Sequence, residues 1–354
     1  MQHHSFPLLI LFLIVAKVHG SEPLVHISLA KEERIVTLRL SNKDGTLTPV
    51  DSVMVDGGPG ALAYHPTLPI LFASIRSIGN LASFRVDESS GKLTRINEIP
   101  AGADPAYLSV DRSGKLLMSA YYREGKITLH AIKANGAIGN ELQSIYTDER
   151  AHAIVSDRTG RYWFAPHTRP NAIFQFTLDD RAKRLVENEK PKLLRKPNTG
   201  PRHLWFHPKI DFAYSSDEQG SSVSTYALDT ASGVLSLRQT LSTLPRAGTD
   251  ATANTTSHIE VHPSGKFVYV ANRGHDSIAR YAVNPRDGML THLGNTPTEA
   301  TTRSFNIAPG GRFLIAAGQT SGNLAVFQIN SEEGHLKRLN TLLVGKTPWW
   351  VTIR

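Results

Sequence analysis

The sequence predicts an all-β fold, a seven-bladed β-propeller with four strands in each blade, and three observations support this. Two short apolar strands joined by a turn recur as a unit along the chain. Successive copies of this unit follow one another at intervals of 45 to 55 residues. The last copy lacks three strands, and three unassigned strands lie at the opposite end of the chain. Four short strands per repeat of this length are typical of a propeller blade.

The composition is that of a globular protein. The chain has 354 residues, of which 40% are hydrophobic and 20% charged, and its 39 Lys and Arg against 31 Asp and Glu give a net charge of +8. These values exclude a disordered tail protein, a collagen and a coiled coil. Cysteine is absent, which excludes disulfides, thiol nucleophiles, iron–sulfur clusters and cysteine zinc sites.

The first 20 residues predict a secretory signal peptide. They contain an apolar run, Leu8–Val15, followed by the short segment Val18-His19-Gly20. The run is too short to span a bilayer, and no other stretch of the chain approaches that length. We therefore expect cleavage near Gly20, export to the periplasm or the outside of the cell, and a single propeller domain over residues 21–354. A cytoplasmic location is the alternative.

Each repeat is recognised by the apolar residue that precedes its first turn. These anchor residues are Tyr64, Val110, Val155, Phe206, Val261 and Ile307. The turns contain His-Pro, or Asp with Gly. A third apolar strand follows in each repeat, for example Leu81–Val86, and a segment such as Gly91-Lys92-Leu93 opens a fourth.

The two ends of the chain together supply one more blade. Pro348–Ile353 has the pattern of a first strand, and Ile353 lies 46 residues after Ile307. The missing partners are Leu24–Ser28, Ile35–Leu40 and Leu47–Val53. Pairing of the tail beside the head would close the ring and leave no sheet edge exposed. An open sandwich of similar strands is the alternative, and the regular period argues against it.

Polar side chains collect at one face of the predicted ring. In a propeller the first strand of each blade lines the central channel and runs from one face of the ring to the other. The second strand runs back antiparallel to it. The start of the first strand and the end of the second therefore lie at the same face of the ring. Arg202 and Glu218 are 16 residues apart, which matches two strands of about five residues joined by a turn. Polar residues at the equivalent points are His152, His203, His258, Arg303, Asn306, Asp217, Asn272, Arg273 and Gln319.

This set of residue types suits an anionic substrate. Arginine stays charged and can hold a carboxylate or phosphate at two points. A Glu or His can move protons, and an arginine near a carbonyl can stabilise an oxyanion. We therefore expect substrate-binding side chains at His203, Arg303, Asn306, Gln319 and His258. The turn histidines His65, His207 and His262 lie at the other face, and we expect them to be structural.

No metal or cofactor is expected. The sequence contains no Gly-x-Ser-x-Gly, His-Glu-x-x-His, P-loop or Gly-x-Gly-x-x-Gly motif, and no carboxylate cage suited to Ca²⁺ or Mg²⁺. Nucleic acid is not expected as a partner, because there is no run of Lys and Arg and no aromatic–basic motif.

Four segments resemble the seven-bladed propeller lactonase family, which includes bacterial 6-phosphogluconolactonase and the fungal 3-carboxy-cis,cis-muconate lactonizing enzyme. The segments are Gly200–Pro208, Ala271–Ile278, Arg303–Ile307 and Leu314–Gln319. The resemblance covers most of residues 24–354 and is strongest over residues 200–330. It implies an acid/base Glu and His with substrate-binding arginines at one mouth of the channel.

The resemblance implies catalytic roles for four residues. The family's Arg of Gly-Pro-Arg-His falls on Arg202, its strand-ending Glu on Glu218, and its Arg of Asn-Arg on Arg273. Around Glu218 the chain has Ser-Asp-Glu-Gln where the family commonly has an Asn-Glu pair. The family's His falls on Ala151 in ungapped register, so its assignment to His152 requires a shift of one residue.

Three functions remain open from the sequence. The first is a lactonase that opens an acidic sugar lactone of the 6-phosphogluconolactone type, with Glu218 or His152 handling protons and Arg202, Arg273 and Arg303 holding the anion. The second is a cycloisomerase of the carboxymuconate type, which needs the same groups. The third is a secreted propeller without enzymatic activity that binds a ligand or a protein.

The expected partner is an anionic small-molecule lactone. The sequence determines neither the natural substrate nor the oligomeric state. Asn254-Thr255-Thr256 is an N-glycosylation sequon, which matters only in a eukaryotic secretory pathway.

Overall fold

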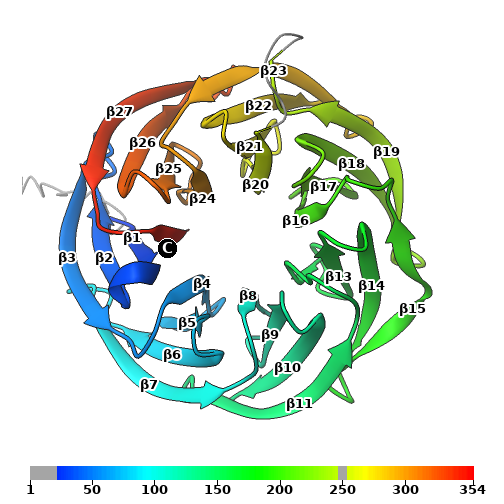
Figure 1. The fold of residues 1–354 in the computed structure, drawn as a ribbon, viewed down its shortest axis with the longest axis horizontal. Coiled ribbons are helices and arrows are strands. Elements are labelled where there is room, and N and C mark those ends of the chain that lie inside the picture. Colours follow the sequence, from blue (N-terminus) through cyan, green and yellow to red (C-terminus); the bar gives the residue numbers. More distant parts are fainter. Residues whose placement is uncertain (1–21, 246–252) are drawn as a thin grey trace, which may run out of the picture.

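Seven four-stranded antiparallel sheets surround a central channel in the computed structural model, which describes residues 22–245 and 253–354 (Figure 1). The seven-bladed propeller predicted from the repeats is confirmed. The predicted signal peptide, residues 1–20, lies outside the described residues.

The blades follow the chain in order around the ring. The blade that contains both ends has the strand order β28-β1-β2-β3, and the others each use four consecutive strands. The strand bounds are β1 Leu24–Leu29, β2 Arg34–Leu40, β3 Leu47–Met54, β4 Pro59–Tyr64, β5 Ile70–Ile75, β6 Asn80–Val86, β7 Leu93–Pro100, β8 Pro105–Val110, β9 Leu116–Tyr121, β10 Lys126–Ile132, β11 Ile138–Tyr146, β12 Val155–Ser156, β13 Tyr162–His167, β14 Ala172–Asp179, β15 Arg184–Leu194, β16 Pro201–Phe206, β17 Phe212–Asp217, β18 Ser222–Asp229, β19 Val234–Ser242, β20 Thr255–Val261, β21 Phe267–Arg273, β22 Ser277–Val283, β23 Leu290–Pro297, β24 Thr302–Ile307, β25 Phe313–Gly318, β26 Asn323–Ile329, β27 Leu336–Leu343 and β28 Pro348–Ile353. A short 3-10 helix, η1 (Ala30–Glu32), follows β1.

The tail of the chain closes the ring beside the head, as the spacing predicts. Strand β28 pairs antiparallel with β1, with Val25 opposite Ile353 and Ile27 opposite Val351. The backbone N–H groups of Leu24 and Arg354 each donate to the carbonyl oxygen of the other, at 2.9 Å. The first strand of this blade is therefore hydrogen-bonded along its length, and the ring has no open edge there.

The burial of each strand follows its distance from the channel. All six residues of the second strand β5 are buried, because neighbouring blades cover both faces of the sheet at that depth. In the outermost strand β3 only Leu47 is fully buried. Outer strands face solvent on one side, so they show the alternation of a half-buried strand.

The turn histidines bond to the next blade at the face opposite the predicted site. The Nε2 atoms of His65, His207 and His262 lie 3.0, 2.9 and 2.8 Å from carbonyl oxygens of turn glycines in the following blade. For His262 that residue is Gly311, where a Cβ would lie 2.4 Å from the imidazole Nε2. The structural role expected for these histidines is confirmed.

One blade has a shorter first strand than the pattern predicts. Strand β12 contains only Val155 and Ser156, and a single isolated bridge joins Ala151 to His167 further along. Between these points the facing strand carries Pro166, which has no N–H to donate to a ladder. Its carbonyl oxygen still accepts from the N–H of His152 at 3.0 Å.

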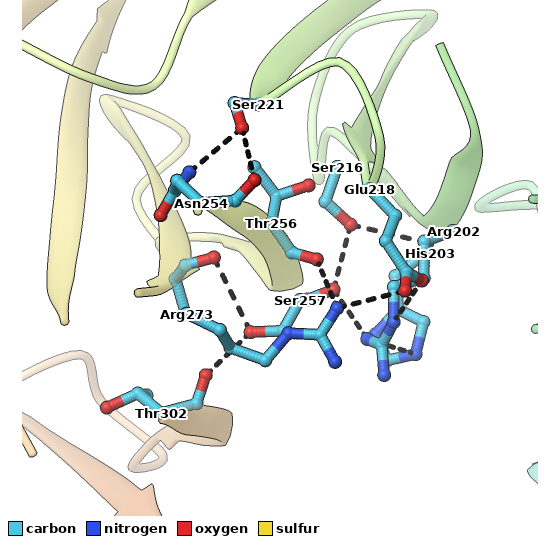
Figure 2. Close-up of polar contacts among 11 residues, drawn as sticks. Arg202, His203, Ser216, Glu218, Ser221, Asn254, Thr256, Ser257, Arg273 and Thr302 are labelled. Carbon is cyan, nitrogen blue, oxygen red and sulfur yellow. Dashed lines mark hydrogen bonds and ion pairs between the residues drawn. The ribbon is translucent and has the colours of Figure 1, made fainter. Parts of the chain in front are cut away.

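The sequon asparagine is an internal residue of the fold. Asn254 is buried, and its Nδ2 donates to the Ser221 hydroxyl at 3.0 Å (Figure 2). The same nitrogen donates to Oδ1 of Asn272 at 3.1 Å. The acceptor nitrogen for a glycan is therefore enclosed in the folded protein. Over residues 22–245 and 253–354, no helix has the length and apolar character needed to cross a membrane.

Candidate active site

A cavity of about 310 Å³ lies at one mouth of the channel. Every residue that lines it lies at the start of a first strand or at the end of a second strand. The lining residues are Arg76, Asp104, Tyr122, Arg123, His152, Glu218, Arg273, Arg303 and Trp349. The rule that polar residues at these strand ends share one face is therefore confirmed.

Glu218 lies between two guanidinium groups. Its Oε2 is 3.1 Å from Nε of Arg202, and its Oε1 is 3.0 Å from Nη2 of Arg273 (Figure 2). Burial alone would raise the pKa of Glu218, but the charges of Arg202 and Arg273 outweigh burial and lower it. Glu218 is therefore a carboxylate at neutral pH, oriented by two fixed cations.

Arg202 lies behind Glu218, under the cavity rather than on its surface. Its side chain is almost fully enclosed, with 1% of the residue exposed. Its Nη1 donates to the carbonyl oxygen of Ser257 at 2.6 Å and to Nε2 of His203 at 3.2 Å. Burial, and then the charge of Arg273, lower the pKa of Arg202 to about 9, so the guanidinium stays charged at neutral pH.

The cavity wall carries more positive than negative charge. Four arginines line it, but only two carboxylates do, and both of these, Glu218 and Asp104, are already ion-paired. Asp104 Oδ1 accepts from Nε of Arg76 at 2.6 Å, and its Oδ2 is 3.8 Å from Nε of Arg123. The remaining positive charge attracts an anion into the cavity.

Arg303 is the cation with the clearest need for such an anion. Within the described part of the chain it forms no ion pair, and its guanidinium lies 3.8 Å from the centroid of the Trp349 ring. Burial and the neighbouring Arg202 and Arg76 lower the pKa of Arg303 well below its ordinary value. A bound anion would relieve both the burial penalty and the repulsion.

His152 is held as a neutral imidazole. Burial is the main cause of its strongly lowered pKa, and the charges of Arg202 and Arg303 lower it further. Its ring packs edge-on against Tyr122 and against His203, with centroids 5.4 and 5.2 Å away. Its Nδ1 atom is buried and bonds to no group in the described residues. The cavity wall therefore contains a neutral imidazole, His152, as well as the Glu218 carboxylate.

A larger cavity of about 950 Å³ adjoins the first. The two share Arg76, Asp104, Arg123 and Trp349. The larger cavity extends over helix η1, with Lys31, and over the segment that leads into β28, with Lys346. Its other polar lining residues are Glu32, Ser77, Gln319, Thr320, Ser321 and Thr347. A substrate bound in the inner cavity thus has room for a substituent that points outward.

Comparison with known proteins shows the family. The family model described as "Lactonase, 7-bladed beta-propeller" matches residues 24–353. The chain belongs to the seven-bladed β-propeller lactonase family. The family resemblance suggested by its sequence motifs is confirmed.

Several relatives of this lactonase family match most of the chain. A 6-phosphogluconolactonase of Pectobacterium carotovorum is 32% identical over 274 residues, which cover 77% of this chain and 81% of that protein. A 6-phosphogluconolactonase of Bacillus subtilis is 28% identical over 267 residues, covering 73% and 76%. The solved structure of a periplasmic gluconolactonase from Pseudomonas aeruginosa superposes with a TM-score of 0.86 at 27% identity, covering 94% and 99%.

The structure brings most of the predicted lactonase residues together. Glu218, Arg273, Arg303 and His152 line the inner cavity, and Arg202 supports Glu218 from behind. Ala151, the ungapped alternative to His152, is fully buried in the isolated bridge to His167. The shift of one residue at His152 thus matches the geometry.

Four predicted substrate-binding residues lie elsewhere. His203 and His258 are 2% and 3% exposed and do not line the cavity, because their ring nitrogens bond to Arg202, to each other and to Glu260. Asn306 lies deeper still, where it bonds to Glu260 and to the backbone of β28. Gln319 lines only the outer cavity. Position at a strand start does not specify how deep in the channel a side chain points.

The sequence reasoning missed five residues of the inner cavity. They are Arg76, Asp104, Tyr122, Arg123 and Trp349. Glu218 was predicted from its position at the end of a second strand. The same criterion could have found three of the five, since Arg76, Tyr122 and Arg123 follow the second strands β5 and β9. Trp349 is the second residue of β28, the position that Arg202 holds in β16 and Arg303 in β24.

No metal site is evident at this mouth. In the described ranges, no three His, Asp or Glu side chains come together in a way that could hold a metal ion.

Proposed function

We propose that this protein hydrolyses the ester bond of an acidic sugar lactone and releases the hydroxy acid. The observation that carries the proposal is the inner cavity itself, where an ionised Glu218 and a neutral His152 face a surplus of arginines. The names of the relatives, 6-phosphogluconolactonase and gluconolactonase, support a lactone substrate. They give no support to the cycloisomerase alternative.

Each side chain of the cavity has a separate role in the proposed hydrolysis. Glu218 accepts a hydrogen bond from the attacking water, and His152 takes a proton from that water as its oxygen bonds to the lactone carbonyl carbon. Arg273 stabilises the negative charge that develops on the carbonyl oxygen. The ring oxygen then leaves as the C–O bond breaks and receives the proton from His152. One water molecule is consumed, and at the end of the reaction Glu218 and His152 are again in their starting protonation states.

Binding of an anion favours this use of His152. After burial, the second cause of its low pKa is the charge of Arg202, followed by that of Arg303. A substrate phosphate or carboxylate near these arginines offsets their effect and raises the proton affinity of the imidazole. An acidic lactone therefore helps to activate the base that attacks it.

The size of the two cavities is consistent with a sugar lactone. About 310 Å³ lies at the lower end of the range for small-molecule pockets, and the adjoining 950 Å³ lies at its upper end. We place the lactone ring in the inner cavity and the acidic substituent toward Arg303 and Arg76.

The test is turnover of 6-phosphogluconolactone, with gluconolactone and carboxymuconolactone measured beside it. Glu218→Gln and His152→Gln should each lower kcat at least a hundredfold while the circular dichroism spectrum is unchanged. Glu299→Gln is the matched control, because Glu299 is a buried carboxylate that is ion-paired with Arg338 outside both cavities. Absence of lactone opening, with Glu218→Gln equal to wild type, would favour a binding module. Activity on carboxymuconolactone alone would favour the cycloisomerase.

We also propose that the chain is exported. The apolar run Leu8–Val15 supports this, as does the structural likeness to a protein described as periplasmic. Mass spectrometry of the mature N-terminus and cell fractionation test it. Retention of residues 1–20 on protein recovered from the cytoplasm would contradict the proposal.

A further inference from the structure

A chain of four buried polar side chains runs from Arg202 toward the middle of the channel. Nη1 of Arg202 is 3.2 Å from Nε2 of His203, and Nδ1 of His203 is 3.0 Å from Nδ1 of His258. Nε2 of His258 is 3.0 Å from Oε1 of Glu260. None of the four residues is more than 3% exposed. This chain of Arg202, His203, His258 and Glu260 links three neighbouring strands, β16, β20 and, through Glu260, β24.

The direction of every hydrogen bond in the chain is fixed by its first member. Arginine can only donate, so Nε2 of His203 must accept. Neutral His203 then carries its proton on Nδ1 and donates to Nδ1 of His258. Since Nδ1 of His258 accepts, the proton of this ring lies on Nε2, which donates to Glu260. One arrangement of protons satisfies all three contacts, and it ends on a carboxylate oxygen.

The carboxylate at the far end is itself held in place. Oε1 of Glu260 also accepts from Nδ2 of Asn306 at 2.7 Å, and its Oε2 accepts from the N–H of Ile307 at 3.0 Å. Asn306 cannot exchange its amide oxygen and nitrogen freely, because its Oδ1 accepts from the N–H of Ile353 at 2.8 Å. Glu260 is therefore anchored by β24 and, through Asn306, by the strand that closes the ring.

We infer that Glu260 is a positioning residue for the proposed active site. Through the proton positions of His258 and His203, it holds the Arg202 guanidinium in the orientation that fixes Glu218. The expected effect of Glu260 on turnover rests on the proposed function. Its expected effect on the proton positions of His203 and His258 does not depend on any substrate. Because arginine does not release its proton, the chain orients groups and does not conduct protons.

A glutamine at position 260 could not accept all the hydrogen bonds that the Glu260 carboxylate accepts. A glutamine has one oxygen, but Glu260 accepts from His258 and Asn306 on one side and from Ile307 on the other. If the amide oxygen faces His258 and Asn306, the amide nitrogen meets the N–H of Ile307 and both ring tautomers are kept. If the amide nitrogen faces His258, that ring must move its proton to Nδ1, where it meets the proton of His203. His203 must then protonate Nε2, which meets the donor Nη1 of Arg202. In this second orientation a change at one end thus places two donors face to face at the other.

The experiment combines kinetics with nitrogen NMR on the full-length protein. In wild type at neutral pH, ¹⁵N spectra of the imidazoles, assigned with His203→Gln and His258→Gln, should show His203 protonated at Nδ1 and His258 at Nε2. Glu260→Gln should change the ¹⁵N chemical shifts of His258, whose Nε2–H loses its carboxylate acceptor. It should also lower kcat for lactone hydrolysis by about 10- to 100-fold with little change in KM, the range seen when a partner that orients an active-site ligand is removed.

Two controls keep the inference falsifiable. Glu299→Gln should leave both tautomers and kcat unchanged, and His203→Leu, which breaks the chain at its middle, should lower kcat as Glu260→Gln does. Opposite tautomers in wild type, or a Glu260→Gln variant with unchanged ¹⁵N shifts of His258 and unchanged kcat, would overturn the inference. If wild type opens no lactone but the tautomers are as stated, the proposed function fails and the positioning geometry stands.

Discussion

The guanidinium of Arg303 lies 3.8 Å from the centroid of the Trp349 ring. The same ring is 5.1 Å from the guanidinium of Arg76. Trp349 belongs to the closing strand β28, while Arg303 and Arg76 come from the blades on either side of it. One indole therefore contacts two cations that repel each other, and it helps to keep both at the mouth of the cavity in the absence of an anion.

Replacement of Trp349 should weaken the binding of acidic lactones. Without the indole, Arg303 and Arg76 lose a shared contact worth about 0.5–2 kcal/mol and spread toward solvent. We expect Trp349→Ala to raise KM for 6-phosphogluconolactone several-fold, and Trp349→Phe to raise it less. Steady-state kinetics test this. An equal rise in KM for a neutral lactone would show that Trp349 contacts the sugar rather than orienting the arginines.

Arg303 should distinguish charged from neutral lactones. It lines the cavity and is not ion-paired in the described residues, so a bound anion is its natural partner. A hydrogen bond to a charged group contributes about 1.5–3 kcal/mol, which corresponds to a loss of affinity of roughly 10- to 100-fold in Arg303→Gln. Gluconolactone, which has no acidic group, should lose far less. Arg85→Gln, at an exposed arginine of β6, is the control. Similar losses for both lactones would exclude an anion-binding role.

Arg202 should behave differently from Arg303. The sequence groups it with the anion-binding arginines, but the structure places it under Glu218, with contacts to Ser257 and His203. Arg202→Ala removes one member of a buried ion pair, a change that typically costs 3–5 kcal/mol. We expect a clear loss of stability in urea and a fall in kcat with acidic and neutral lactones alike. A variant of normal stability with only a raised KM would return Arg202 to the anion-binding group.

Stability should fall as the pH is lowered below about 6.5. Burial lowers the pKa of His26 to about 3, and of His130 and His167 to about 4 each. The unfolded chain therefore binds protons that the folded protein excludes, so stability is present above the ordinary histidine pKa of 6.5 and is lost toward pH 4. Each histidine contributes up to about 1.4 kcal/mol per pH unit in this window. Urea midpoints at pH 7.5 and 5.0 test this, and equal midpoints would contradict it.

The turn histidines should affect stability without affecting turnover. His262 bonds to the Gly311 carbonyl of the next blade and, through Nδ1, to Ser264. His262→Ala should lower the free energy of unfolding by about 1–3 kcal/mol and leave kcat within twofold of wild type. Thermal and urea unfolding measure the first effect, and lactone assays measure the second. A large fall in kcat would show that the two faces of the ring are coupled.

The number of blades and the closure of the ring were predictable from the sequence repeats. A strand pattern with a nearly constant period determines the number of blades, and complementary ends predict the closing pair β28–β1. The pairing of Arg202 with Glu218 followed as well, since two short antiparallel strands return the chain to its starting face. These features depend on the alternation and length of strands, which are local properties of the sequence.

Depth along the channel was not predictable from strand position. His203 follows Arg202 directly, yet Arg202 turns to Glu218 while His203 turns inward to His258. A bulge between Pro201 and His203 alters the alternation of side chains at this point. The sequence pattern has no feature that marks such a bulge, so Asn306 and His258 were assigned to the substrate instead of the channel interior.

The sequence by itself determined the ring of seven blades, its closure, and the mouth at which arginines meet a carboxylate, because strand period and strand length depend on neighbours along the chain. Only the tertiary structure decided which cations line the cavity, which lie beneath it, and how Glu260 connects to Arg202. Those outcomes depend on contacts between side chains of neighbouring blades, such as His203 with His258 and Glu260 with Asn306, which are more than 40 residues apart in the sequence. No local pattern encodes the depth and hydrogen-bond direction that such contacts acquire when the ring is assembled.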